Sequence, residues 1–131
     1  MMKIEAIHHI AILTSNELYE ASKLFYTDVL GFSVLAEVFR KERNSYKLDL
    51  ALHGLYQIEL FSFPDYCERN SFPEAKGLRH LAFAVKDVKA GYEWLCSQNV
   101  KPEEIRIDEF TGKEFLFFHD PNGQPLELYQ L

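Results

Sequence analysis

The segment Arg79-His80-Leu81-Ala82-Phe83-Ala84-Val85-Lys86-Asp87 has a counterpart near the start of the chain, His8-His9-Ile10-Ala11-Ile12-Leu13-Thr14-Ser15-Asn16. In both segments alternating apolar residues follow a histidine, and an Asn or Asp comes seven positions after it. Alternation predicts a strand, and Asn or Asp at its end can cap a following helix. A second pair of segments also matches, because Gln57-Ile58-Glu59-Leu60-Phe61 resembles Pro125-Leu126-Glu127-Leu128-Tyr129. The chain therefore contains a duplicated unit, and each copy carries one histidine and one glutamate.

The composition limits the class of protein. A chain of 131 residues with 47% hydrophobic residues can form one domain with its own core. A net charge of −6 argues against nucleic acid or an anionic membrane as partner. Cys67 and Cys96 stand apart and suggest no zinc ribbon or redox pair. With no apolar run of about 18 residues and no export signal, we expect a cytoplasmic protein with reduced thiols.

Each copy is expected to fold as a βαβββ module. Pro64 to Gly77 has no periodicity and is expected to be a linker. Helices are predicted after Asn16, ending at Gly31, and after Asp87. The expected strands span residues 4–13, 33–39, 46–53 and 56–63, then 78–85, 105–109, 113–119 and 125–130.

The predicted fold class is α+β, with two tandem βαβββ modules in one curved eight-stranded mixed sheet and helices outside. The whole chain, residues 1–131, is expected to be a single domain. Its first module covers about 1–63, the linker about 64–77 and the second module about 78–131.

Strand alternation predicts which face carries the histidines and glutamates. His9 shares a face with Ala11, and His80 shares one with Ala82, whereas the opposite faces carry bulky apolar residues suited to packing helices. A curved sheet would make the first face a concave pocket for a small ligand. Two imidazoles and two carboxylates suit one divalent transition metal. We expect Zn²⁺ or Ni²⁺, with Mn²⁺, Co²⁺ or Fe²⁺ as alternatives. The predicted ligands are His9, Glu59, His80 and Glu127.

Structural roles are the alternative for each of these residues. A single histidine on a strand is more often structural, and an isolated glutamate is more often exposed. Four such residues at matching positions of two matched units favour the metal. The remaining candidates are assigned structural or surface positions: His8 faces away from the pocket, His53 and His119 lie beside turns, and Phe115 and Phe117 belong to the core.

At these residues the sequence resembles the vicinal oxygen chelate superfamily. This superfamily includes glyoxalase I, methylmalonyl-CoA epimerase, fosfomycin-modifying thiol transferases, extradiol dioxygenases and bleomycin-binding proteins. The resemblance covers essentially the whole chain. It lies in the opening His-x-Ala-Ile strand, in Leu24-Phe25-Tyr26 followed by Leu30-Gly31-Phe32, in Arg79-His80-Leu81-Ala82-Phe83, and in Asp120-Pro121-Asn122-Gly123 before Leu126-Glu127-Leu128.

The resemblance also implies roles. Dioxygenases and thiol transferases use a His, His, Glu triad, here His9, His80 and Glu127. A glutamate at position 59 gives the His, Glu, His, Glu set of bacterial glyoxalase I instead. By that resemblance the metal polarises substrate oxygens, and Glu127 moves a proton between adjacent carbons. Glu59 would be the opposing ligand or a second acid–base group.

The chain departs from glyoxalase I at two positions. Leu13 and Phe63 stand where that family is expected to have an arginine and an asparagine that hold glutathione, which argues against glutathione here. The chain more closely resembles small glyoxalase I-like lyases. Candidate cations for an anionic substrate are Arg40, Lys41, Arg43, Lys47, Arg79 and Arg106.

We therefore expect a metal-dependent lyase or isomerase acting on a small α-hydroxycarbonyl or thiohemiacetal-like substrate. The alternatives are an extradiol dioxygenase or thiol transferase of the same superfamily, and a small-molecule-binding protein without catalysis. Because superfamily members often dimerise, a homodimer is expected. Each site could lie within one chain or be shared between two.

Overall fold

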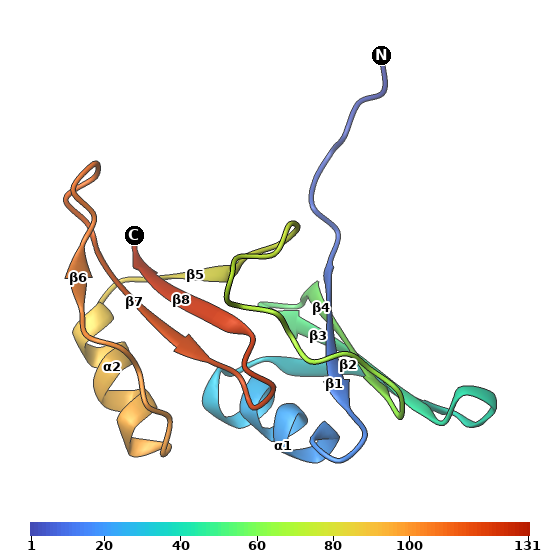
Figure 1. The fold of residues 1–131 in the computed structure, drawn as a ribbon. Helices are drawn as coiled ribbons and strands as arrows, with labels where there is room; N and C mark the ends of the chain where they lie inside the picture. Colours follow the sequence, from blue (N-terminus) through green and yellow to red (C-terminus); the bar gives the residue numbers. More distant parts are fainter. The chain divides into compact units, whose positions relative to one another are not determined.

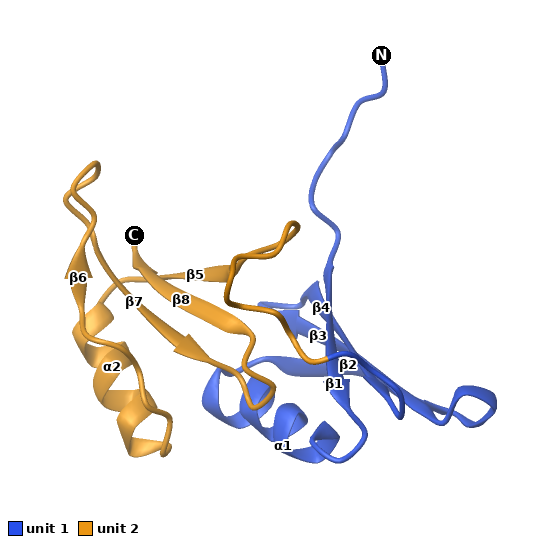
Figure 2. Cartoon of the chain, in the orientation of Figure 1, with its two compact units in different colours: residues 1–67 blue, residues 68–131 orange.

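The computed structural model describes residues 1–131, which form two compact units, Met1–Cys67 and Glu68–Leu131 (Figures 1 and 2). Each unit contains one four-stranded mixed sheet; the first unit has three helical segments and the second has one helix. The predicted α+β class and the tandem modules are confirmed. The single domain of 1–131 stays a prediction. No helix is both long enough and apolar enough to cross a membrane.

The sheet of the first unit has the strand order β1-β4-β3-β2. β1 runs parallel to β4, and the other two pairings are antiparallel. The elements are β1 (Ile10–Ser15), α1 (Tyr19–Leu24), a π-helical turn (Phe25–Val29), β2 (Ser33–Arg40), a 3₁₀ turn (Lys41–Arg43), β3 (Ser45–Leu52) and β4 (Leu55–Phe63).

The sheet of the second unit repeats this arrangement in the order β5-β8-β7-β6, with β5 parallel to β8. The elements are β5 (Leu81–Val85), α2 (Val88–Ser97), β6 (Arg106–Ile107), β7 (Glu114–His119) and β8 (Pro125–Gln130).

The prediction of one eight-stranded sheet is wrong, because the strands pair as two sheets of four. In each unit the first strand pairs with the last strand of the same unit. No strand of one ladder is hydrogen-bonded to a strand of the other.

Both histidines lie directly before a strand. β1 begins at Ile10 instead of the predicted Ile4, because its ladder with β4 begins at the pair Ile10 and Ile58. β5 likewise begins at Leu81 instead of Leu78. His9 and His80 thus occupy the same place in the two units, one residue ahead of the first strand.

The first helical segment, α1 with the π-helical turn that follows it, buries a face that includes two tyrosines and Phe25. Tyr19, Ser22 and Tyr26 are fully buried, whereas Leu18 is exposed. The π-helical turn after α1 adds residues per turn and so changes which side chains face the sheet. The second helix begins as predicted, because the Asp87 side chain accepts a hydrogen bond from the Ala90 N–H at 2.9 Å.

β8 shows how alternation separates the core from the site. Leu126 and Leu128 are buried, and α2 contacts β8 on their side. Gly91 of α2 approaches Leu128 so closely that an added Cβ would lie 2.6 Å from its Cδ1. Glu127 lies between the two leucines in sequence and projects to the other face.

We expect Leu126→Ala to lower the free energy of unfolding by about 2–5 kcal/mol, because it leaves a cavity between β8 and the core. Urea denaturation measures this change. Leu78→Ala is the matched control, since Leu78 is 74% exposed and its truncation should have little effect. Equal losses in the two variants would contradict the assignment of Leu126 to the core.

Candidate metal site and ligand pocket

His80 and Glu127 form a direct pair in the second unit. Glu127 lies opposite Ala82 in the parallel ladder, and the His80 side chain, one residue before β5, reaches the Glu127 carboxylate directly. The His80 Nε2 and Glu127 Oε2 atoms are 2.9 Å apart, and the side chains are 29% and 10% exposed. At 2.9 Å the two atoms are within hydrogen-bond distance of each other. Two ligands bound at about 2.0–2.2 Å to a tetrahedral Zn²⁺ would lie about 3.4 Å apart, so a small separation of the two side chains would let both bind one ion.

Phe115 and Phe117 form the aromatic wall beside this pair. Phe117 lies opposite Glu127, and its ring packs edge-on against that of His80 with 5.0 Å between centroids. The prediction that these phenylalanines belong to the core is wrong, since both line pockets. Residues that lie opposite each other in an antiparallel ladder project to the same face of the sheet, so Phe117 lies on the same face as Glu127. Leu116 and Phe118 fill the core instead.

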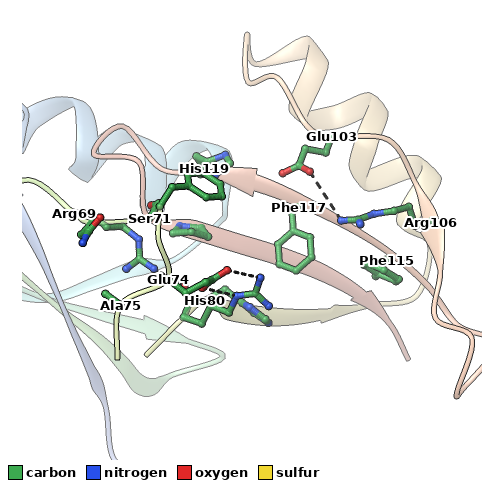
Figure 3. A pocket seen from close by; sticks show the side chains of 14 residues that line it. Arg69, Ser71, Glu74, Ala75, His80, Glu103, Arg106, Phe115, Phe117 and His119 are labelled. Atoms are coloured by element: carbon green, nitrogen blue, oxygen red, sulfur yellow. Dashed lines mark hydrogen bonds and ion pairs between the residues drawn. The ribbon is translucent and has the colours of Figure 1, made fainter. Parts of the chain in front are cut away.

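Two pockets adjoin the pair, and both are lined by the second unit alone. One, of about 450 Å³, is bordered by His80, Glu127, Arg106 and the two phenylalanines. The other, of about 470 Å³, extends from His80 and Phe117 toward Arg69 and Glu74 (Figure 3). His119, predicted to be a surface residue beside a turn, also lines this second pocket. The space is sufficient for a small organic molecule.

Glu59 of the first unit is held in a polar network. The Tyr56 hydroxyl donates to Asp49 Oδ1 at 2.7 Å and lies 3.0 Å from Glu59 Oε2. Lys47 Nζ lies 2.7 Å from Asp49 Oδ1 and 3.4 Å from Glu59 Oε2. Asp49 is directly opposite Glu59 in the ladder, which places its side chain on the same face.

His9 contacts the same tyrosine. Its ring lies 5.0 Å from that of Tyr56, and its Nδ1 lies 2.8 Å from Nδ1 of His8. The prediction that His8 faces away is wrong, because its ring also packs 5.3 Å from Tyr56. Both histidines precede β1, where strand alternation does not apply.

The network changes the protonation of its members. Burial and the contacts with Asp49 and Glu59 raise the pKa of Tyr56, which stays a neutral donor. Burial alone would raise the pKa of Asp49, but hydrogen bonds from Lys47 and Tyr56 outweigh it and hold this pKa below its ordinary value. The pKa of Lys47 is raised, chiefly by its hydrogen bond to Asp49.

The structure gathers no three His, Cys, Asp or Glu side chains into a metal-binding group. His80 is in direct contact with Glu127, and both His9 and Glu59 contact the side chain of Tyr56. The four-residue metal site stays a prediction. Sequence reasoning missed Tyr56 and Asp49, and it named Arg106 only as one cation among six.

Similarity to known proteins covers the whole chain. The model of the Glyoxalase/Bleomycin resistance protein/Dioxygenase superfamily matches residues 6–128. The uncharacterized protein YaeR of Escherichia coli strain K12 is 55% identical over 99% of both chains. The crystal structure of a glyoxalase family protein from Enterococcus faecalis superposes with a TM-score of 0.89 and 47% identity, covering 98% of this chain and 99% of that one.

More distant relatives have named activities. A 2-epi-5-epi-valiolone epimerase from Actinomyces sp is 30% identical over 96% of this chain and 79% of its own. The metallothiol transferase FosB of Staphylococcus saprophyticus is 28% identical over 96% of this chain and 77% of its own. Proteins similar to this chain thus include enzymes of at least two reaction classes.

We expect Asp49→Asn to make stability less sensitive to acid. The folded pKa of Asp49 lies below its ordinary 3.8, so the unfolded chain binds more protons there and stability falls as the pH falls. Urea denaturation between about pH 5 and pH 3 measures the slope, which should be shallower in the variant. The exposed Asp65 provides the control Asp65→Asn, which should keep the parent slope. An unchanged slope in Asp49→Asn would contradict the network.

Proposed function

Because the chain belongs to the Glyoxalase/Bleomycin resistance protein/Dioxygenase superfamily, we propose that it is a metal-dependent lyase or isomerase. Its substrate would be a small oxygenated compound of the α-hydroxycarbonyl or thiohemiacetal type. The observation that carries the proposal is the His80–Glu127 pair, which brings an imidazole nitrogen within 2.9 Å of a carboxylate oxygen beside an aromatic pocket.

The proposed metal ligands are His9 and Glu59 from the first unit and His80 and Glu127 from the second. Imidazole nitrogens and carboxylate oxygens suit Zn²⁺ or Ni²⁺, and two carboxylates balance the charge of a dication. A bound divalent ion supplies Lewis-acid polarisation of the substrate oxygens. The homodimer also stays a prediction.

Glu127 is the proposed base. Its side chain is 10% exposed and is in direct contact with the His80 imidazole. A carboxylate that lines an aromatic pocket can take a proton from a substrate carbon and return it to the neighbouring carbon. His80 would orient the carboxylate through the contact between Nε2 and Oε2. The epimerase among the relatives supports this assignment, since an epimerase inverts the configuration at one carbon.

Glu59 is the proposed opposing ligand or second acid–base group. Tyr56 fixes the orientation of its carboxylate, and Lys47 lies at the longer distance of 3.4 Å. Coordination through the oxygen that does not contact Tyr56 would leave the tyrosine bond in place. Hydrogen-bonded partners of this kind orient metal ligands in many sites.

A thiol transferase or dioxygenase reaction is the second candidate. It needs only His9, His80 and Glu127 as ligands. The observation that favours it is the engagement of Glu59 by Lys47 and Tyr56, which gives this carboxylate a structural role without a metal. The metallothiol transferase relative points the same way.

We expect His80→Asn to weaken Zn²⁺ or Ni²⁺ binding more than the roughly 10–100-fold that loss of an outer-shell partner costs. Isothermal titration calorimetry measures the dissociation constant. Free metal at about 1,000 times that constant should add about 4 kcal/mol to the stability of the parent protein. His53→Asn is the matched control, because His53 lies in an exposed turn with a φ of 52° that asparagine tolerates. Parent-like binding by His80→Asn would exclude His80 as a ligand.

The two carboxylates should differ when each is changed to glutamine. Exchange of carbon-bound hydrogen for deuterium in a panel of α-hydroxyketones, followed by NMR in D₂O, reports proton transfer. We expect Glu127→Gln to slow this exchange by about 10²–10⁴ while keeping part of the metal affinity. Glu59→Gln should weaken metal binding, and full retention would favour the three-ligand chemistries. The control is Glu109→Gln, which lines the same pocket without contacting His80.

A further inference from the structure

Arginines concentrate at one pocket of an otherwise acidic protein. The chain has 20 acidic and 14 basic residues, and only five of the basic residues are arginines. Three of these five, Arg69, Arg79 and Arg106, line the pocket of about 470 Å³ in the second unit. Figure 3 labels Arg69 and Arg106. Only two acidic residues, Glu74 and Glu103, line it with them. The local charge is thus opposite in sign to that of the whole chain.

The three guanidinium groups differ in how far they are already paired. Arg79 makes two hydrogen bonds to the Glu74 carboxylate, at 3.2 and 2.9 Å. Arg69 donates to the carbonyl oxygen of Arg79 and to the side chain of Gln124. Arg106 has only a long contact of 3.9 Å to Glu103, beyond hydrogen-bond distance. Its N–H groups are therefore available to a ligand.

Arg106 is nevertheless held in position. Its Cζ lies 5.0 Å from the centroid of the Phe115 ring and 5.6 Å from that of Phe117. Stacking on aromatic rings fixes the plane of a guanidinium group without consuming its hydrogen-bond donors. Such an arrangement presents a flat fork of donors, which matches the oxygens of a carboxylate or phosphate.

Phe117 connects this arginine to the proposed catalytic pair. Its ring centroid is 5.6 Å from Arg106 Cζ and 5.0 Å from the centroid of His80. Phe117 also lies opposite Glu127 in the ladder between β7 and β8. Glu127 itself lines the adjoining pocket of about 450 Å³, which shares His80, Arg106, Phe115 and Phe117 with the pocket of about 470 Å³. A small molecule lying against Phe117 can therefore contact the guanidinium group and also face the His80–Glu127 pair.

We propose that this pocket binds a small organic anion, whose carboxylate or phosphate oxygens are held by Arg106 and whose apolar body lies against Phe115 and Phe117. The inference rests on the proposed function in one respect: the anion would be the substrate that Glu127 acts on. The binding itself requires no metal, so it can be tested separately.

The test uses metal-free protein, dialysed against EDTA, and three probes with the same aromatic ring: phenylacetate, phenyl phosphate and the neutral phenylacetamide. Titrations followed by ¹H–¹⁵N NMR give the dissociation constants and the residues affected. We expect at least one of the two anions to bind 10-fold or more tightly than the amide, with the largest shifts at Arg106, Phe115 and Phe117. The tighter of the two anions identifies the group that the pocket prefers.

Arg106→Gln should weaken binding of that anion at least 10-fold. Its side chain is 46% exposed, so the variant should fold, and circular dichroism checks this. Arg43→Gln removes the same charge from an exposed turn of the first unit and should change the affinity less than twofold.

Equal binding of amide and anions, shifts elsewhere on the protein, or unchanged affinity in Arg106→Gln would overturn the anion subsite whatever the metal does. Anion binding in a protein that takes up no metal would instead leave the subsite intact and overturn the proposed function alone.

Discussion

The parallel pairing of first and last strands within each unit determines the geometry of the site. In both ladders an alanine lies opposite the glutamate: Ala11 opposite Glu59, and Ala82 opposite Glu127. Residues in register on neighbouring strands share a face, so the small methyl group leaves room beside each carboxylate. Each histidine lies two residues before that alanine. A slip of one residue in either ladder would turn the glutamate into the core. The buried apolar residues on either side of each glutamate, Ile58 and Leu60 or Leu126 and Leu128, exclude such a register.

The two units have the same strand arrangement but differ in the side chains of the strand that lies next to the glutamate. In β3 the residues on the glutamate face are Lys47 and Asp49, whereas in β7 they are Phe115 and Phe117. The carboxylate of Glu59 is consequently fixed by ionic and hydroxyl partners. That of Glu127 has an imidazole on one side and aromatic rings nearby. Two chemically identical groups in unlike surroundings can take unlike roles, one as a fixed ligand and one as a base.

Sequence periodicity could predict most of the fold, because alternation and turn residues act locally. The limits of β8 and the Asp87 cap follow directly from the sequence. The residue that lies opposite Glu59 in the sheet cannot be predicted in this way. A regular two-residue turn at His53 and Gly54 would pair Asp49 with Ile58, but a bulge between Leu50 and Ala51 moves Asp49 opposite Glu59. No residue type near the bulge indicates its presence in the sequence, so the network around Tyr56 could be found only in the structure.

The position of Lys47 shows how the first unit could keep its order when a metal ion binds. Lys47 Nζ is closer to Asp49, at 2.7 Å, than to Glu59, at 3.4 Å, so its charge is balanced mainly by Asp49. A dication that takes a Glu59 oxygen would repel Lys47, but the shorter ion pair gives the lysine a partner to retain. Without Asp49 the lysine would have Glu59 as its nearest carboxylate and would compete with the metal for it. Asp49 therefore supports the proposed site without binding the metal, because it keeps the Lys47 ammonium group from competing for Glu59.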